Sequence, residues 1–225
     1  VLLREWEIVQ TAKDGVAARH QLVANPRPMK ATLDNEQRKA LDALLSSTNA
    51  VSVFRGGAGT GKSFVLRELV EQLRESGRRV VVLAPQRQQV VDMEKAGLPS
   101  PSTVANFLLK GELATGAVVV VDEAGQIGGR QMLELLRLAR DRNARVILSG
   151  DTRQHGAVEA SDALLAIERH SGVKPVELHK IRRQDPALGR DYDERNWIRT
   201  YRKAVESAAA GKVAESFGRL DKMGA

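Results

Sequence analysis

The sequence contains no cysteine among its 225 residues. This absence excludes disulfide bonds, zinc sites built from cysteine and catalysis by a thiol, and it is compatible with the cytoplasmic location that we expect. Long apolar runs are also missing, since a run such as residues 117–121 falls far short of the ~20 residues that a membrane-spanning helix needs. No charged segment followed by an apolar stretch opens the chain, so we expect neither a secretory signal nor insertion into a membrane.

Aromatic residues are scarce, at 4% of the chain, whereas 35 lysines and arginines outnumber 28 acidic residues and give a net charge of +7. Such a balance favours an acidic partner, of which nucleic acid is the commonest; an ordinary basic surface is the alternative. With so few aromatic side chains, contacts with nucleic acid would depend on phosphates more than on base stacking. The 42% of apolar residues is enough for a globular core.

Short β-branched runs alternate with helical patterns from residue 50 onward. Strands are expected at residues 50–54, 79–84, 117–123, 145–151 and 175–178, and helices at 62–75, near 87–95 and at 129–142. Continuous apolar runs are typical of strands that are buried on both faces. The alternation therefore predicts an α/β fold, a mostly parallel sheet with helices on both faces.

The chain is expected to contain three regions: a helical lead-in and linker at 1–30, the α/β domain at 31–185 and a helical tail at 186–225. The domain opens with a helix at 34–47, where Asp34 is the N-cap and Gln37 completes a capping box. In the tail, Gly211 is a plausible end for one helix. Because the sequence begins at Val1 instead of a methionine, we expect it to be a piece of a longer protein.

The segment FRGGAGTGKS at 54–63 fits the phosphate-loop pattern G-x-x-x-x-G-K-[ST]. An apolar strand is expected before it and a helix after it, which is the context that the motif requires. Glycines let successive backbone N–H groups point at phosphate oxygens, and the helix N-terminus adds partial positive charge. We expect Lys62 to reach the β- and γ-phosphates of ATP and Ser63 to ligate Mg²⁺. The whole ATP-binding segment is Gly57, Ala58, Gly59, Thr60, Gly61, Lys62 and Ser63.

A second motif, VVVVDEAG at 118–125, ends an apolar strand in two carboxylates. A carboxylate at a strand end near a phosphate loop holds Mg²⁺ directly or through water, and this role is expected of Asp122. A second carboxylate beside it can polarise the attacking water, so Glu123 is the expected general base. The glutamate favours hydrolysis of ATP over phosphorylation of a small molecule, because the acceptor of a kinase would replace that water.

These motifs, in this order, resemble the motor domain of superfamily 1 helicases, specifically the RecD-like branch. Within it the chain is most similar to the helicase part of MobF-type conjugative relaxases, over about residues 32–184. The resemblance implies a RecA-like P-loop NTPase fold with ATP and Mg²⁺ as cofactors and single-stranded DNA as a partner.

The resemblance also implies roles for residues outside the phosphate-loop motif and the acidic motif. In LDNEQRKAL (33–41), which looks like the family's Q-motif, Gln37 would read adenine, although a capping role alone is the alternative. VVLAPQRQQVVDM (81–93) is similar to motif Ia, so Pro85, Gln86 and Arg87 would touch the DNA backbone. Relatives often carry threonine or serine with small residues here, and a solvated loop is the alternative. Thr103, in PSTVANFL (101–108), would contact a phosphate.

Two later segments resemble the family's phosphate sensors. LSGDTRQHGAV (148–158) looks like motif III, in which Gln154 would sense the γ-phosphate. LHKIRRQ (178–184) is similar to motif IV, and alignment of its Arg-Gln pair favours Arg183 over Arg182 as the arginine that reaches the γ-phosphate. The four histidines show no ligand spacing and are expected at the surface or in packing contacts: His20, His155, His170 and His179.

The function implied is that of a 5′→3′ ATP-dependent DNA helicase or translocase, of which this chain is the first motor domain. A second RecA-like domain of the same parent chain would lie beyond residue 225, proteins of the conjugation machinery are further possible partners, and the piece alone would hydrolyse ATP weakly. One alternative is a regulatory or recruitment module with a vestigial ATPase. Another is a small-molecule P-loop kinase, which Glu123, the Gln154 loop and the absence of an acceptor lid disfavour.

Overall fold

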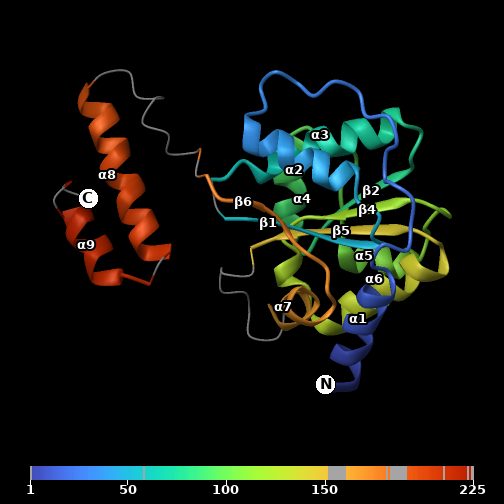
Figure 1. The fold of residues 1–225 in the computed structure, drawn as a ribbon. Helices are drawn as coiled ribbons and strands as arrows, with labels where there is room; N and C mark the ends of the chain where they lie inside the picture. The colour runs from blue at the N-terminus through green and yellow to red at the C-terminus, as the bar shows by residue number, and fades with distance from the viewer. Residues whose placement is uncertain are drawn as a thin grey trace. The chain divides into compact units, whose positions relative to one another are not determined.

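The computed structural model describes residues 2–57, 59–151, 161–180, 182, 192–209, 211–221 and 223. The chain divides into two compact units, Val1–Gly57 with Lys62–His179 and Ala58–Gly61 with Lys180–Ala225. The first unit contains the sheet and the second contains the two C-terminal helices (Figure 1). The region boundaries expected at residues 30 and 185 remain a prediction.

In the described part of the first unit, one sheet is formed by β1 (Val51–Gly56), β2 (Val80–Ala84), β3 (Ser102–Thr103), β4 (Val118–Val121), β5 (Arg145–Gly150) and β6 (Val176–Leu178). Their order across the sheet is β3-β2-β4-β5-β1-β6, and every neighbouring pair is parallel. The predicted α/β class is confirmed, as is its RecA-like arrangement of a parallel sheet that carries the phosphate loop after its first strand.

Helices cover both faces of this sheet (Figure 1). The four valines of β4 explain why, because successive side chains of a strand point to opposite faces. Val119 and Val121 pack in one core and Val118 and Val120 in the other, and all four are fully buried. The first core includes α1 (Leu2–Asp14), α5 (Val104–Lys110), α6 (Gly129–Asp141) and α7 (Ser161–His170), and the second includes α2 (Asn35–Leu45), α3 (Lys62–Glu75) and α4 (Arg87–Lys95).

The N-terminal segment contains one helix, α1, which is followed by a stretch without regular secondary structure. α1 ends at Asp14, and Gly15 then accepts a hydrogen bond from the backbone N–H of Ala50 at 2.7 Å. A Cβ atom at Gly15 would lie 2.6 Å from the Cβ of Ala50, so only glycine fits this chain crossing. The sequence patterns also missed β3, α5 and α7, which are short and whose apolar residues are explained by tertiary packing.

The register of the central strands determines where the functional motifs meet. β5 lies between β4 and β1, with Leu148 beside Val121 and Gly150 beside Arg55. The carboxyl ends of these three parallel strands therefore share one edge, the usual ligand-binding edge of such a sheet. The residues that directly follow the strands are Gly57, Asp122 and Asp151.

The second unit contains α8 (Tyr192–Ala209) and α9 (Val213–Asp221). Gly211, between them, has φ +76° and donates its backbone N–H to Ala208 O, as expected of a helix end. In α8, Trp197 is 50% exposed and stacks on Tyr201 with ring centroids 5.3 Å apart. Among the described helices of both units, none is long and apolar enough to cross a membrane.

Candidate functional site

Lys62 is the first residue of α3 and its side chain points at the two acids that follow β4. Its Nζ atom lies 3.0 Å from Oε1 of Glu123 and 3.7 Å from Oδ1 of Asp122. Both Lys62 and Asp122 are buried, and Glu123 is half-buried. The structure thus brings together the lysine and both carboxylates that the sequence motifs nominated, although about 60 residues separate them in the chain.

Asp122 is oriented by two hydrogen bonds to the same oxygen. Its Oδ1 atom accepts from the hydroxyl of Ser149 at 2.9 Å and from the backbone N–H of Glu123 at 3.0 Å. Ser149 is fully buried on β5, and the sequence patterns did not nominate it. No hydrogen bond to Oδ2 is found among the described residues, so this oxygen can ligate a cation, and Mg²⁺ prefers oxygen ligands. Ser63, in the first turn of α3, was expected to supply a second oxygen, and this role stays a prediction.

Glu123 occupies a strained backbone conformation, with φ 51° and ψ 37° in the left-handed region. Such a conformation in a residue other than glycine costs on the order of 1–3 kcal/mol and clusters at functional sites. The short 3₁₀ helix η1 (Ala124–Gln126) begins directly after it. A Cβ atom at Gly150 would lie 3.3 Å from the backbone nitrogen of Gly125, so η1 packs tightly on the end of β5. This contact explains the glycine at position 150.

Gln37 is 5% exposed in α2, and its side chain serves the capping box predicted from the sequence. Its Oε1 atom accepts the backbone N–H of Asp34 at 3.1 Å, while Asp34 Oδ1 accepts the backbone N–H of Gln37 at 3.0 Å. The capping role is therefore confirmed. A role in reading adenine stays a prediction.

A glutamine that the sequence analysis did not single out connects the loop after β2 with the loop after β4. Oε1 of Gln126, in η1, accepts hydrogen bonds from Nε2 of Gln86 at 3.1 Å and from Nε2 of Gln89 at 2.8 Å. Arg87 is the first residue of α4 and Gln86 is its N-cap; both are exposed and follow Pro85. The segment expected to touch DNA is thus bonded to a residue three positions after Glu123.

Thr103, the other residue expected to contact a phosphate, caps α5. Its Oγ1 atom accepts the backbone N–H of Asn106 at 3.2 Å. An N-cap of this kind stabilises a helix by about 1 kcal/mol, which is a sufficient structural reason for the threonine. Its contact with DNA stays a prediction.

Within the first unit, Gly57 directly follows β1 and lies beside Asp151. A Cβ atom at position 57 would be 3.4 Å from Oδ2 of Asp151. Gly59 and Gly61 have φ values of +76° and +82°, which favour glycine and agree with the phosphate-loop motif. Within the second unit, Arg182 contacts this loop: its backbone N–H donates to Gly59 O and its Nη1 donates to Thr60 O, both at 2.6 Å.

Three expected site residues lie outside the described residues: Ala58, Gln154 and Arg183. The preference for Arg183 over Arg182 as the phosphate-reaching arginine therefore remains untested. Among the described residues, no cluster of three or more histidine or acidic side chains could hold a metal ion by itself.

Comparison with known proteins identifies a family and several relatives. A family model described as an AAA domain matches residues 32–225. The multifunctional conjugation protein TraI of Escherichia coli K12 is 28% identical over 176 residues, which are 72% of this chain and 10% of TraI. A probable conjugal transfer protein TraA of Sinorhizobium fredii is 29% identical over 157 residues, which are 68% of this chain and 14% of TraA.

Among solved structures, domain III of the replication initiation protein DnaA from Thermotoga maritima has a TM-score of 0.42 and 15% identity, covering 87% of this chain and 98% of that one. The sequence relatives confirm the predicted resemblance to conjugation proteins. The chain spans only about a tenth of the length of TraI.

Proposed function

The chain belongs to the AAA-domain family, and from this premise we propose that it is the ATP-binding first motor domain of a 5′→3′ DNA helicase or translocase, RecD-like and part of a larger conjugation protein. The observation that carries the proposal is the meeting of Lys62, Asp122 and Glu123 at the carboxyl edge of the sheet. This is the set of groups that ATP hydrolysis needs: a cation for phosphate, a carboxylate for Mg²⁺ and a base for water.

In the proposed reaction, Lys62 leaves Glu123 for the β- and γ-phosphate oxygens of ATP. The freed carboxylate of Glu123 then orients the attacking water and accepts its proton. Asp122, which is oriented by the hydrogen bond from Ser149 to its Oδ1, would hold Mg²⁺ together with the hydroxyl of Ser63. Bound Mg²⁺ would neutralise charge that develops on the phosphate oxygens.

A motor must change its affinity for its track with the state of its nucleotide. Single-stranded DNA is the proposed track, contacted by Pro85, Gln86, Arg87 and Thr103. Gln126 supplies a direct route between the two functions, because it lies three residues after Glu123 and accepts hydrogen bonds from Gln86 and Gln89. Gln154 and Arg183 are proposed as the γ-phosphate sensors.

The test is to measure ATP hydrolysis by the longer parent protein with and without single-stranded DNA. We expect DNA to stimulate turnover, and Lys62→Ala to abolish both ATP binding and stimulated turnover. Lys110→Ala, which removes an exposed lysine from the end of α5, is the matched control and should behave as the unaltered protein. Turnover that ignores DNA would indicate a small-molecule kinase, and the lack of any stimulated turnover would indicate a vestigial ATPase.

A further inference from the structure

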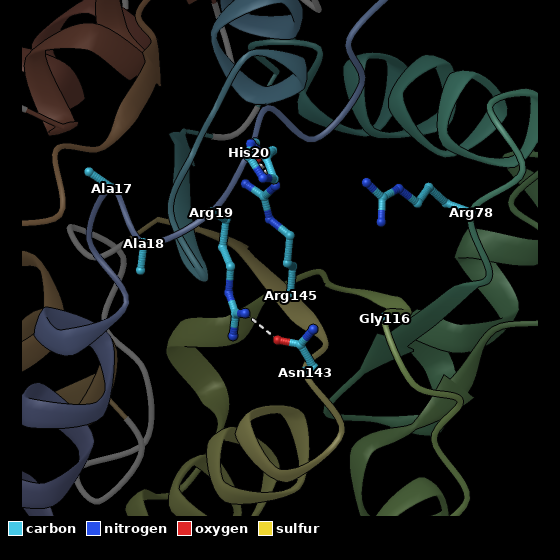
Figure 2. Close-up of a pocket in the computed structure, with 8 residues that line it drawn as sticks. All are labelled: Ala17, Ala18, Arg19, His20, Arg78, Gly116, Asn143 and Arg145. Atoms are coloured by element: carbon cyan, nitrogen blue, oxygen red, sulfur yellow. Dashed lines mark hydrogen bonds between the residues drawn. The ribbon is translucent and has the colours of Figure 1, made fainter.

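A pocket lies at the opposite edge of the sheet from Lys62, where the parallel strands begin. It has a volume of about 540 Å³. Arg145 is the first residue of β5, Arg78 stands two residues before β2, and Gly116 stands two residues before β4. We call it the amino-edge pocket; its polar lining is Arg19, His20, Arg78, Asn143 and Arg145 (Figure 2).

The charge of this pocket is unbalanced. Three arginines line it, and none of its lining residues, all of which are described, carries a carboxylate. Arg145 is only 7% exposed, yet it donates to three neutral backbone oxygens: those of Asn49 at 3.0 Å, His20 at 2.8 Å and Ser47 at 2.6 Å. Arginine is almost never this deeply buried unless it is paired with an anion.

The guanidinium of Arg145 is rigidly held but not saturated. Three of its five N–H groups are used by the carbonyl oxygens, which leaves two donors. Burial, followed by the positive charges of Arg78 and Arg19, lowers the pKa of Arg145 to about 10. At neutral pH the side chain therefore remains charged, and an anion in the pocket would relieve the repulsion among the three guanidinium groups.

The guanidinium groups of Arg19 and Arg78 also have N–H donors that are available to a ligand. Arg19 is held through Nη1 by the side-chain oxygen of Asn143 (Figure 2), while its Nε atom is buried without a hydrogen-bond partner. Arg78 reaches toward Arg145 from another wall (Figure 2), and no hydrogen bond or ion pair of its guanidinium is found among the described residues. Arg78 is exposed, so its donors are accessible to a ligand. The Nε atom of Arg19 differs, because a buried donor without a partner is costly and is usually satisfied in a folded protein.

The walls of the pocket are set by two tight turns. Asn143 has φ 51° and Gly116 has φ +72°, and the backbone N–H of Gly116 donates to Arg142 O at 2.9 Å. A Cβ atom at Gly116 would contact nothing within 4 Å, so the pocket is open above this residue.

We propose that the amino-edge pocket binds a phosphate group. Arg145 is the immobile cation at the bottom of the pocket, and the side chains of Arg19 and Arg78 close on the bound phosphate. Three guanidinium groups match the charge and the several acceptor oxygens of phosphate better than those of a single carboxylate, and arginine binds phosphate in a bidentate manner. The phosphate can come from a free ion such as pyrophosphate or from an oligonucleotide. This site is independent of the proposed ATPase, because it lies at the other edge of the sheet.

The test is an NMR titration of the 225-residue chain with pyrophosphate, in a Lys62→Ala background that removes the phosphate-loop lysine. We expect saturable shifts of the backbone amides of Ala17, Ala18 and Gly116. Arg78→Gln should weaken this binding by about tenfold, as the loss of one charge-assisted hydrogen bond predicts. The matched control is Arg79→Gln, which removes the same charge from an exposed neighbour that does not line the pocket and should leave the affinity unchanged.

Three results would overturn the proposal: no saturable shift at Gly116, equal weakening by Arg78→Gln and Arg79→Gln, or binding of acetate as tight as that of pyrophosphate at the same ionic strength. Short single-stranded oligonucleotides with and without a 5′-phosphate distinguish the sources. Shifts at Gly116 with both indicate backbone phosphates, shifts with the phosphorylated one alone indicate a terminal phosphate, and shifts with pyrophosphate alone indicate a free ion; each outcome supports the phosphate site.

Discussion

The ammonium group of Lys62 lies 3.0 Å from the carboxylate of Glu123, so the helix after the phosphate loop is joined to the pair of acids that follows β4. The same ammonium lies 3.7 Å from Asp122, which places one positive charge between two negative ones. Because Lys62 is buried, this pair is screened less than a surface ion pair would be. The predicted phosphate binder and the predicted base therefore hold each other in position.

The substitution Glu123→Gln should separate binding from hydrolysis. The amide would keep the shape of the side chain but could not accept the proton of the attacking water, so we expect ATP affinity to be retained and turnover in the parent protein to fall by about 100-fold or more. Measurement of fluorescent-ATP binding and of phosphate release checks this. Comparable losses of binding and turnover would instead show that Glu123 acts through the position of Lys62.

Ser149→Ala should raise the Mg²⁺ concentration that ATP binding requires. The hydroxyl of Ser149 donates to Oδ1 of Asp122, and removal of a hydrogen-bond partner that orients a metal ligand typically costs about tenfold in metal affinity. Titration of Mg²⁺ against ATP affinity measures this, with Ser149→Thr expected to restore much of the effect. Ser46→Ala, at the exposed end of α2, is the control, and an equal effect there would contradict the assignment.

Gln126→Leu should reduce the ratio of DNA-stimulated to basal ATP hydrolysis in the parent protein. Leucine has a similar size but cannot accept the hydrogen bonds of Gln86 and Gln89, so the loop after β2 would no longer be bonded to η1. The DNA concentration needed for half-maximal stimulation should rise. Gln88→Leu removes an exposed glutamine that bonds within α4, to Asp92, and should leave the ratio unchanged; a fall there as well would refute the role of Gln126.

Acid should loosen α1 from α6. Arg137 donates to both carboxylate oxygens of Glu7, at 2.7 and 2.6 Å, and this hydrogen bonding lowers the pKa of Glu7 from its ordinary value of 4.5. A lowered pKa in the folded state means that the stabilisation is present above about pH 4.5 and is lost as the pH falls through the folded-state value. The fluorescence of Trp6, measured in a Trp197→Phe background, should report the change. Glu7→Gln should abolish this pH dependence, and its persistence would assign the change to another group.

Much of the fold could be predicted because its signals are local. The bounds of α3 and α4 match the expected helices at 62–75 and 87–95, and five of the strands lie where apolar β-branched runs were found. The phosphate loop and the acids after β4 were identified for the same reason, since their residue types are fixed by chemistry at short spacing. By contrast, β3 is two residues long and gave no usable signal. The helix α7 was missed although its apolar residues Ala163, Leu164 and Ile167 recur at helical spacing.

The sequence alone thus determined the class of the fold, the phosphate-binding and acidic motifs and the resemblance to helicase motors, whereas the roles of Gln154 and Arg183 stay predictions. Only the tertiary structure decided that Ser149 orients Asp122, that Gln126 joins the two loops and that Arg19, Arg78 and Arg145 share one pocket. The reason is physical: each of these contacts depends on which strand lies beside which. Strand order is set by the packing of the whole domain, which no local pattern of residues encodes.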